Sequence, residues 1–152
     1  MRVLMVCLGN ICRSPIAEGV LRHKASLLGL DMQVDSAGTI GFHAMSPPHP
    51  QSIACLKKQG VDIRDLKSRK IEHDDLDAFD YILCMDRSNV SDVMALCNHA
   101  SQKNKIHLIR DYSDDGLGLE VPDPYGMSDE HFEEVSRMLH RAIDGFIART
   151  TT

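Results

Sequence analysis

The sequence of 152 residues has no tryptophan, few aromatic residues of any kind (5%) and no long hydrophobic run. The longest unbroken apolar run, residues 3–8, is too short for a transmembrane helix or the core of a signal peptide. Positive charge is also scarce, since 17 Lys and Arg face 22 Asp and Glu for a net charge of −5. Nucleic acids and anionic membranes require a basic surface. We therefore expect a soluble cytoplasmic protein with no nucleic-acid or membrane partner, which holds any anionic ligand by local groups.

Cysteine is present in an odd number, five, scattered along the chain, which argues against a secreted disulfide framework. Eight histidines are many, but none has the spacing or the cysteine neighbours of a zinc site, so we expect no metal and no cofactor. The remaining composition is that of an ordinary globular protein. A chain of this length buries about 68–70% of its unfolded surface, which predicts one self-sufficient domain over residues 1–152.

Hydrophobic patterning alternates between the periods of strands and helices. Ser14 and Pro15 are placed to open the first helix as its N-cap and first residue, and Gly29 is placed to end it. Asp86 is placed to cap a later helix. The last helix carries a stripe of apolar residues: Phe132, Val135, Leu139, Ala142, Ile143 and Phe146. Strands are predicted at residues 2–7, 33–37, 80–85 and 105–109, and helices at 14–28, 51–59, 87–97 and 128–149.

This alternation predicts an α/β fold with a parallel sheet covered by helices on both faces. Residues 38–50 form a Gly- and Pro-rich surface loop in this interpretation, and residues 111–124 form an acidic, Gly-rich one. In such sheets, ligands bind beyond the carboxyl ends of the strands, where the strand order reverses. The loop of residues 7–14, which follows the first strand, lies at such an end.

That loop places Cys7 at the end of a strand and Arg13 six residues later, where a helix begins. Backbone N–H groups of a curled loop and of the first helical turn can converge on one tetrahedral dianion, with the helix dipole behind them. The same field favours the thiolate form of Cys7. Arg13 offers a planar fork of donors for two phosphate oxygens. An isolated cysteine at a strand end is more often a small buried hydrophobe, but this context favours a nucleophile.

The other residues of the loop suit the same interpretation. Ser14 can donate its hydroxyl to the sulfur, and Gly9 permits a tight backbone. Asn10 tolerates a left-handed conformation or can tie the loop with its amide. Leu8 and Ile11 are expected to line the floor of a pocket.

The segment Cys-Leu-Gly-Asn-Ile-Cys-Arg-Ser-Pro closely resembles the signature of the low-molecular-weight protein tyrosine phosphatases, bacterial type. Further motifs of the family follow in order along the whole chain: Asp35–Thr39, Pro47-Pro48, Phe79–Asp86 and Val121–Gly126. The resemblance implies a three-layer fold with a four-stranded parallel sheet, flavodoxin-like or Rossmann-like. It also implies metal-independent hydrolysis of phosphotyrosine in proteins, and of small aryl phosphates, through a phosphocysteine.

By this resemblance Cys7 is the nucleophile, Arg13 binds the phosphate and Asp123 is the general acid. One carboxyl group can protonate the leaving oxygen and later activate water, and Asp123 stands on a loop stiffened by Pro124. Without the resemblance, the pair Asp123-Pro124 would be interpreted only as part of a turn. Phe42 and Tyr125 are candidate walls of the pocket. The expected substrate-binding residues are Leu8, Gly9, Asn10, Ile11, Cys12, Ser14, Phe42 and Tyr125, and the family pairs the cysteine at position 12 with the nucleophile in a protective disulfide.

The resemblance implies phosphotyrosine proteins as partners, with a bacterial tyrosine autokinase as one candidate. Inorganic phosphate is expected as product and inhibitor, and the protein as a monomer or weak dimer. Two positions depart from the family pattern. Leu66 replaces a histidine that supports the phosphate loop, and Gly126 replaces a second tyrosine of animal members, which leaves Tyr125 as the acceptor for regulatory phosphorylation.

Three other functions compete with this interpretation. Thioredoxin-coupled arsenate reductases share the loop but need a downstream redox pair, whereas Cys84 and Cys97 fall on a predicted buried strand and helix end. Protein arginine phosphatases have threonine where Ile11 stands, and isoleucine suits an aryl ring better than a guanidinium. A silent phosphotyrosine-binding module would keep Arg13 without needing both Cys7 and Asp123.

Overall fold

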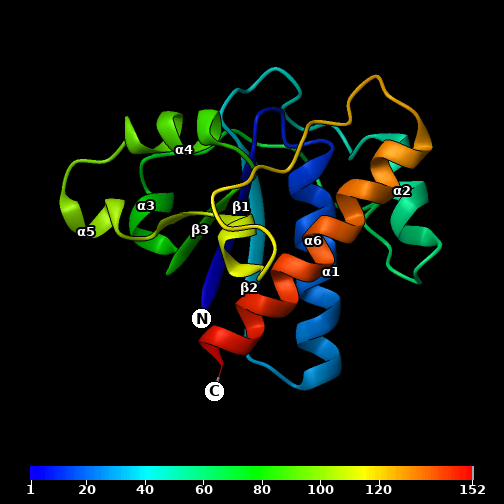
Figure 1. The fold of residues 1–152 in the computed structure, drawn as a ribbon. Coiled ribbons are helices and arrows are strands. Elements are labelled where there is room, and N and C mark those ends of the chain that lie inside the picture. Colours follow the sequence, from blue (N-terminus) through cyan, green and yellow to red (C-terminus); the bar gives the residue numbers. More distant parts are fainter. Residues whose placement is uncertain (152) are drawn as a thin grey trace.

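A computed structural model describes residues 1–151. Four parallel strands form one sheet in the order β2-β1-β3-β4 (Figure 1). Their bounds are Arg2–Cys7 (β1), Gln33–Gly38 (β2), Tyr81–Cys84 (β3) and Ile106–Leu108 (β4). The α-helices are Arg13–Leu28 (α1), Pro50–Lys57 (α2), Asp75–Ala78 (α3), Arg87–Met94 (α4), Ala100–Lys103 (α5) and Asp129–Thr150 (α6). The α/β fold with a four-stranded parallel sheet is thus confirmed.

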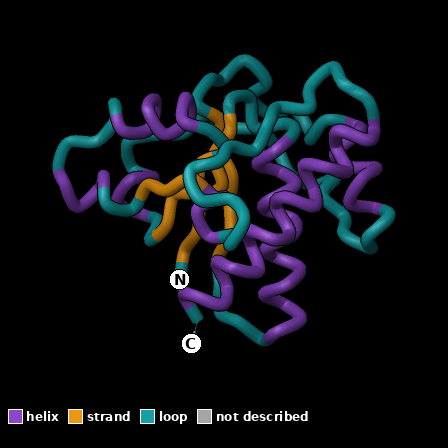
Figure 2. The backbone as a smooth tube through the Cα atoms, viewed as in Figure 1, coloured by secondary structure: helices purple, strands orange, loops and turns teal. Residues whose placement is uncertain are grey.

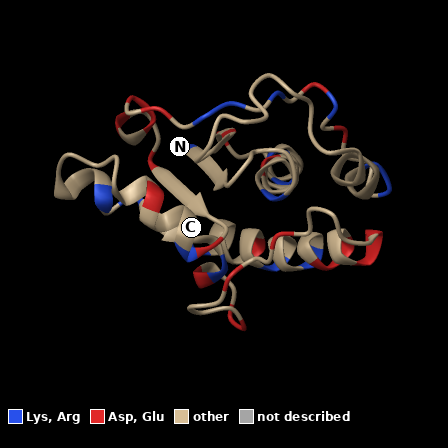
Figure 3. Ribbon diagram, turned by 90° about the horizontal axis from the view of Figure 1, so that it is seen from above, with Lys and Arg blue, Asp and Glu red and all other residues tan. Residues whose placement is uncertain are grey.

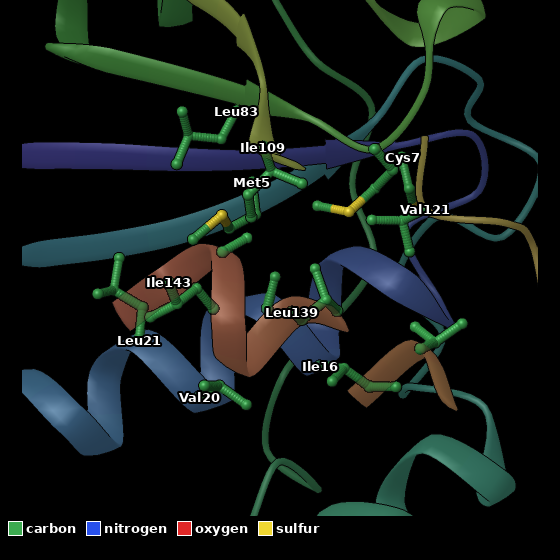
Figure 4. Close-up of a cluster of buried hydrophobic side chains, with 14 of the residues drawn as sticks. Met5, Cys7, Ile16, Val20, Leu21, Leu83, Ile109, Val121, Leu139 and Ile143 are labelled. Carbon is green, nitrogen blue, oxygen red and sulfur yellow. The ribbon is translucent and has the colours of Figure 1, made fainter. Parts of the chain in front are cut away.

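Helices cover both faces of the sheet, in three layers (Figures 1 and 2). Along β1, alternate residues point to opposite faces because the side-chain period of a strand is two. Val3 and Met5 belong to the core beneath α1, α2 and α6, which Figure 4 draws, and Leu4 and Val6 to the core beneath α3 and α4. The predicted apolar stripe of α6 is confirmed, since all six of its residues are buried: Phe132, Val135, Leu139, Ala142, Ile143 and Phe146.

The start of α1 differs from the sequence prediction. The helix begins at Arg13 with Cys12 in the capping position, and no side chain caps it. Ser14 is therefore not an N-cap, and its buried hydroxyl faces the sulfur of Cys7 instead. Pro15 is the third helical residue rather than the first, which is tolerated because the first four N–H groups of a helix have no partner in it. The predicted stop is confirmed, since Gly29 ends α1 with φ +66°.

Other boundaries shift by a few residues. The helix predicted to Cys97 ends at Met94, although its predicted cap is confirmed: Asp86 accepts from the N–H of Asn89. The short helices α3 and α5 and a 3-10 turn, Ile109–Tyr112 (η1), were not predicted. Each has four residues, too few for hydrophobic periodicity to be recognised. Among the described residues, no helix is long and apolar enough to cross a membrane.

Candidate active site

The strand order reverses between β1 and β3, and their carboxyl ends meet the loops at the top of Figure 1. A cleft of about 280 Å³ opens there. The loop between β1 and α1 lines it with Cys7, Leu8, Gly9, Ile11, Cys12 and Arg13. The loop after β2 contributes Ile40, Phe42 and His43, and the segment before α6 contributes Asp123 and Tyr125. Three segments distant in sequence thus converge at the edge predicted for the ligand.

The sulfur of Cys7 is held at the floor of this cleft. Only 3% of the residue is exposed, and Figure 4 shows it at the end of the buried cluster near Val121. Its Sγ accepts from the backbone N–H of Asn10 at 3.3 Å and lies 3.0 Å from the hydroxyl of Ser14. The sulfur of Cys7 is therefore held in place by the backbone of Asn10 and the hydroxyl of Ser14.

Most backbone N–H groups of the loop have no partner in the described part of the chain. Those of Leu8, Gly9, Ile11, Cys12 and Arg13 donate no hydrogen bond within residues 1–151. The carbonyls of Cys7 and Leu8 instead accept from Thr39 and Ile40, which extends the β1–β2 pairing into the loop. Because the helix that follows adds its dipole, this row of unpaired donors is an anion-binding concavity.

Asn10 ties the loop to the rest of the site. Its φ of +56° is in the left-handed region, which asparagine tolerates. The side-chain amide donates to the hydroxyls of Ser14 at 2.7 Å and Ser36 at 2.9 Å, and its oxygen accepts from the N–H of Arg69 at 3.0 Å. Leu66 packs against the core. The loop is therefore tied through Asn10 to α1, to β2 and to the segment that contains Arg69.

The same network continues to a buried carboxyl group in α1. Ser36 donates to Oε1 of Glu18 at 2.6 Å, and Arg22, one turn further, lies 2.6 Å from Oε2. Glu18 is 2% exposed. Desolvation raises the pKa of Glu18 above its usual value, against the opposing effects of Ser36 and Arg22. Position 18 has no pattern in the sequence that marks it as part of the site.

Arg13 is fixed on one side and open on the other. Its Nη1 donates to Oδ2 of Asp86 at 2.7 Å and to the carbonyl of Val121 at 3.0 Å. Within residues 1–151, Nε and Nη2 make no hydrogen bond, so this edge of the guanidinium is left for two oxygens of a ligand. Asp86 follows β3, the strand next to β1, so the rule about strand ends could have identified it from the sequence.

Asp123 lines the same cleft as the loop that carries Cys7. Its Oδ2 is 3.8 Å from Nη2 of Arg13, and its Oδ1 accepts from the N–H of Tyr125 at 3.1 Å. The side chain is 45% exposed, so water reaches it. Tyr125 and Phe42 are exposed aromatic side chains on the cleft's rim. Gly126 has φ +77°, in the left-handed region that favours glycine.

Nine of the predicted site residues line the cleft, namely Cys7, Leu8, Gly9, Ile11, Cys12, Arg13, Phe42, Asp123 and Tyr125. Asn10 and Ser14 lie behind the loop, in contact with Cys7. Sequence analysis missed Ile40 and His43 because they stand in a loop without hydrophobic periodicity. The ring of His43 packs close to Gly9, where a Cβ would lie 3.1 Å from its Cδ2.

The other thiols are shielded from the solvent to different degrees. Burial raises the pKa of Cys12 to about 12, with further contributions from Asp123 and Cys7. Cys84 is fully buried in β3, and Cys97 donates to the carbonyl of Val93. The described residues contain no cluster of His, Cys, Asp and Glu that could hold a metal ion.

Known proteins resemble the chain over nearly its whole length. The family model of the low molecular weight phosphotyrosine protein phosphatases matches residues 2–151. The low molecular weight protein-tyrosine-phosphatase YfkJ of Bacillus subtilis is 39% identical over 150 residues, which are 96% of this chain and 93% of that protein. The human low molecular weight phosphotyrosine protein phosphatase is also 39% identical, over 97% of this chain and 94% of its own.

Solved structures show the same fold. The crystal structure of a protein tyrosine phosphatase from Entamoeba histolytica superimposes with a TM-score of 0.93 at 34% identity, and covers 98% of this chain and 96% of its own. The crystal structure of the low molecular weight protein tyrosine phosphatase from T. tengcongensis superimposes with a TM-score of 0.90 at 35% identity, and covers 98% of this chain and 99% of its own. The chain therefore belongs to the low molecular weight phosphotyrosine protein phosphatase family.

Proposed function

We propose that this chain, acting as one domain, hydrolyses phosphotyrosine in proteins through a phosphocysteine on Cys7. One observation carries the proposal: the thiol of Cys7, the open edge of Arg13 and the carboxyl group of Asp123 line the same cleft, beside unpaired backbone N–H groups. Such donors bind the three oxygens of a phosphoryl group and stabilise the charge that develops on them during transfer.

In the first step, the Cys7 thiolate attacks phosphorus while the bond from phosphorus to the tyrosyl oxygen breaks. Asp123, in its acid form, gives its proton to that oxygen, and tyrosine leaves. In the second step, the Asp123 carboxylate takes a proton from water as the water oxygen attacks phosphorus. The phosphorus–sulfur bond breaks, and inorganic phosphate and the thiolate are released. No oxidant, reductant or metal is needed, and Asp123 is accessible to water as these roles require.

The apolar walls of the cleft favour an aryl ester. Leu8, Ile11, Ile40 and Phe42 offer apolar contacts that suit an aromatic ring. Arsenate reduction would need a downstream pair of reactive thiols, but Cys84 is buried within the sheet, where desolvation raises its pKa. A silent binding module would not require both Cys7 and Asp123.

The same proposal includes the substrates of the protein, its location in the cell and its oligomeric state. Phosphotyrosine proteins, including a bacterial tyrosine autokinase, are the proposed substrates, in the cytoplasm. Inorganic phosphate should compete for the same donors as the substrate, and the protein should act as a monomer or weak dimer.

Turnover of p-nitrophenyl phosphate, phosphotyrosine, phosphoarginine and arsenate, each with a chelator present, tests the assignment. We expect release of phosphate from the first two only. Cys7→Ser should abolish turnover and keep the fold, measured by circular dichroism, because an alcohol replaces the thiolate at the same position. Full activity of Cys7→Ser, or strict dependence on added divalent metal, would refute the mechanism.

A further inference from the structure

A second, larger hollow adjoins the cleft. It is a groove of about 580 Å³ whose lining is mainly apolar. Ile11 and Ile53 belong to it, the segment 46–50 forms one side, and α2 provides Ala54 and Lys57 at the other end. Ile11, His43 and Tyr125 line both the groove and the cleft. The two hollows are therefore one continuous surface.

The side of the groove formed by residues 46–50 is held firmly. Three of these five residues are proline, which fixes their φ angles. The N–H of His49 donates to the carbonyl of Ile11 at 2.8 Å, and the carbonyl of Ser46 accepts from the N–H of Ser68 at 2.8 Å. The ring of His49 stacks on Phe132 of α6 and meets the edge of Tyr125. This surface is formed before any ligand arrives, so binding orders little of the protein.

The groove carries one charged side chain, Lys57, in the last turn of α2. No ion pair within residues 1–151 includes Lys57, whereas the neighbouring Arg64 is paired with Asp62 at 2.9 Å. In a chain with a net charge of −5, an unpaired cation at the end of an apolar groove is a place for a carboxylate.

We propose that this groove binds the polypeptide that flanks the phosphotyrosine of the substrate, and that it selects sequences with a bulky apolar side chain followed by an acidic one. The inference rests on the proposed function. With phosphotyrosine in the cleft, an extended chain passes Ile11 and Tyr125 and enters the groove, where an apolar side chain packs on Ile11 and Ile53. A carboxylate further along reaches Lys57.

Phosphotyrosine peptides that differ at single positions test this specificity. One series exchanges leucine for serine beside the phosphotyrosine, on the amino side and on the carboxyl side separately, and a second exchanges glutamate for lysine further out. We expect kcat/KM to favour leucine by about tenfold on one side, and glutamate by about threefold on that same side. p-Nitrophenyl phosphate and free phosphotyrosine serve as substrates that do not reach the groove.

Two variants alter the groove outside the cleft. Ala54→Trp fills it and should remove the preference for leucine, and Lys57→Glu should reverse the preference for glutamate. Ala148→Trp in α6 and Lys103→Glu in the last turn of α5 are matched controls at exposed positions and should keep both preferences. All four variants should hydrolyse p-nitrophenyl phosphate at the rate of the parent protein.

Equal kcat/KM across the peptides, with p-nitrophenyl phosphate still hydrolysed, would overturn the groove's role and leave the proposed function intact. A flat peptide profile together with a dimer that Lys57→Glu dissociates, measured by sedimentation, would assign the groove to a second copy of the chain instead. Absence of turnover with every substrate would overturn the proposed function and this inference with it.

Discussion

At the scale of single residues, the site holds the positive charge of Arg13 in a fixed position and leaves the carboxyl group of Asp123 accessible to water. Arg13 is 3% exposed and held by Asp86 and Val121, so its position costs little to organise when the ligand binds. Asp123 is 45% exposed, accepts from the N–H of Tyr125 and lies 3.8 Å from Arg13, so its carboxyl group is accessible to water. Preorganised charge suits binding of the phosphoryl group, and accessibility suits acid–base chemistry.

Asp123→Asn tests this separation. We expect the phosphorylation of Cys7 to slow by about 10²–10⁴-fold for phosphotyrosine, whose leaving oxygen needs a proton. The loss should be smaller for p-nitrophenyl phosphate, because nitrophenolate leaves with little help. Rapid-quench measurement of the first step with both substrates checks the difference. Equal losses for the two leaving groups would remove Asp123 from the acid role.

Cys12 offers a second prediction at this scale. It lines the same cleft as Cys7, and its pKa of about 12 keeps it a thiol at neutral pH. The small thiolate fraction of Cys12 can attack a sulfenic acid formed on Cys7 by peroxide, which forms a disulfide, releases hydroxide and stops further oxidation. We expect peroxide to inactivate the protein, dithiothreitol to restore it, and mass spectrometry to detect a peptide that links Cys7 to Cys12.

The control for that reaction is Cys12→Ser, in which peroxide inactivation should become largely irreversible because nothing captures the sulfenic acid. Cys97→Ser, which removes a partly exposed thiol outside the cleft, should recover as the parent protein does. Recovery of Cys12→Ser to the parent level would make Cys12 a packing residue only.

At the scale of elements, the long helices and the strands could be predicted because their apolar periodicity extends over enough residues. The β1 loop could be placed too, since a cysteine, a glycine and an asparagine stand between a strand and a helix. The true start of α1 could not be predicted, because the hydroxyl of Ser14 contacts the sulfur of Cys7 and does not cap the helix. The segment 39–49 has no period. Of its three residues in the cleft, Phe42 was identified by resemblance, whereas Ile40 and His43 could not be predicted because their place depends on tertiary packing.

The packing of α6 on η1 leads to a prediction at the same scale. Gly145 faces the backbone of Tyr112, and a Cβ there would overlap the carbonyl oxygen of Tyr112 and lie 2.8 Å from its carbonyl carbon. Gly145→Ala should therefore push α6 away from η1 and lower the free energy of unfolding by about 1–3 kcal/mol or more. Urea denaturation measures the change.

Gly41→Ala is the matched control for that measurement. Its Cβ would meet only Lys70, at 3.6 Å, which is an ordinary contact, and Gly41 has no positive φ. Its effect on the unfolding free energy should stay within about 0.5 kcal/mol. If Gly145→Ala were equally mild, the close approach of α6 to η1 would not constrain the fold.

At the scale of the whole molecule, the two cores meet at a sheet in which the inner strand β1 ends at Cys7. Acidic and basic residues are interspersed along the chain, as the red and blue segments of the ribbon in Figure 3 show. The sequence predicts this architecture because its apolar residues recur with the period of a strand in some segments and with the period of a helix in others. It cannot predict buried polar links between layers, such as Glu18 to Ser36 and Asn10, because each joins single residues whose neighbours in sequence have no part in the bond.

The titration of Glu18 should therefore be visible in the stability of the entire protein. Its pKa is raised in the folded state, chiefly by desolvation, from an ordinary value of 4.5. Between the two values the folded protein holds a proton that the unfolded chain has released, so stability falls as pH rises through this window. The slope from this residue is up to about 1.4 kcal/mol per pH unit. Urea denaturation from pH 4 upward measures it.

Comparison with Glu18→Gln isolates this contribution, because glutamine keeps the bond to Ser36 and does not titrate. The unfolding free energy of the parent protein should decline relative to that of the variant as pH rises above about 4.5, and then level off. Glu134→Gln on α6 should give a small difference of opposite sign, since Arg137 lowers the pKa of that exposed carboxyl group. Parallel pH profiles for the parent protein and Glu18→Gln would mean that Glu18 titrates alike in both states, with Arg22 offsetting the desolvation of its carboxylate.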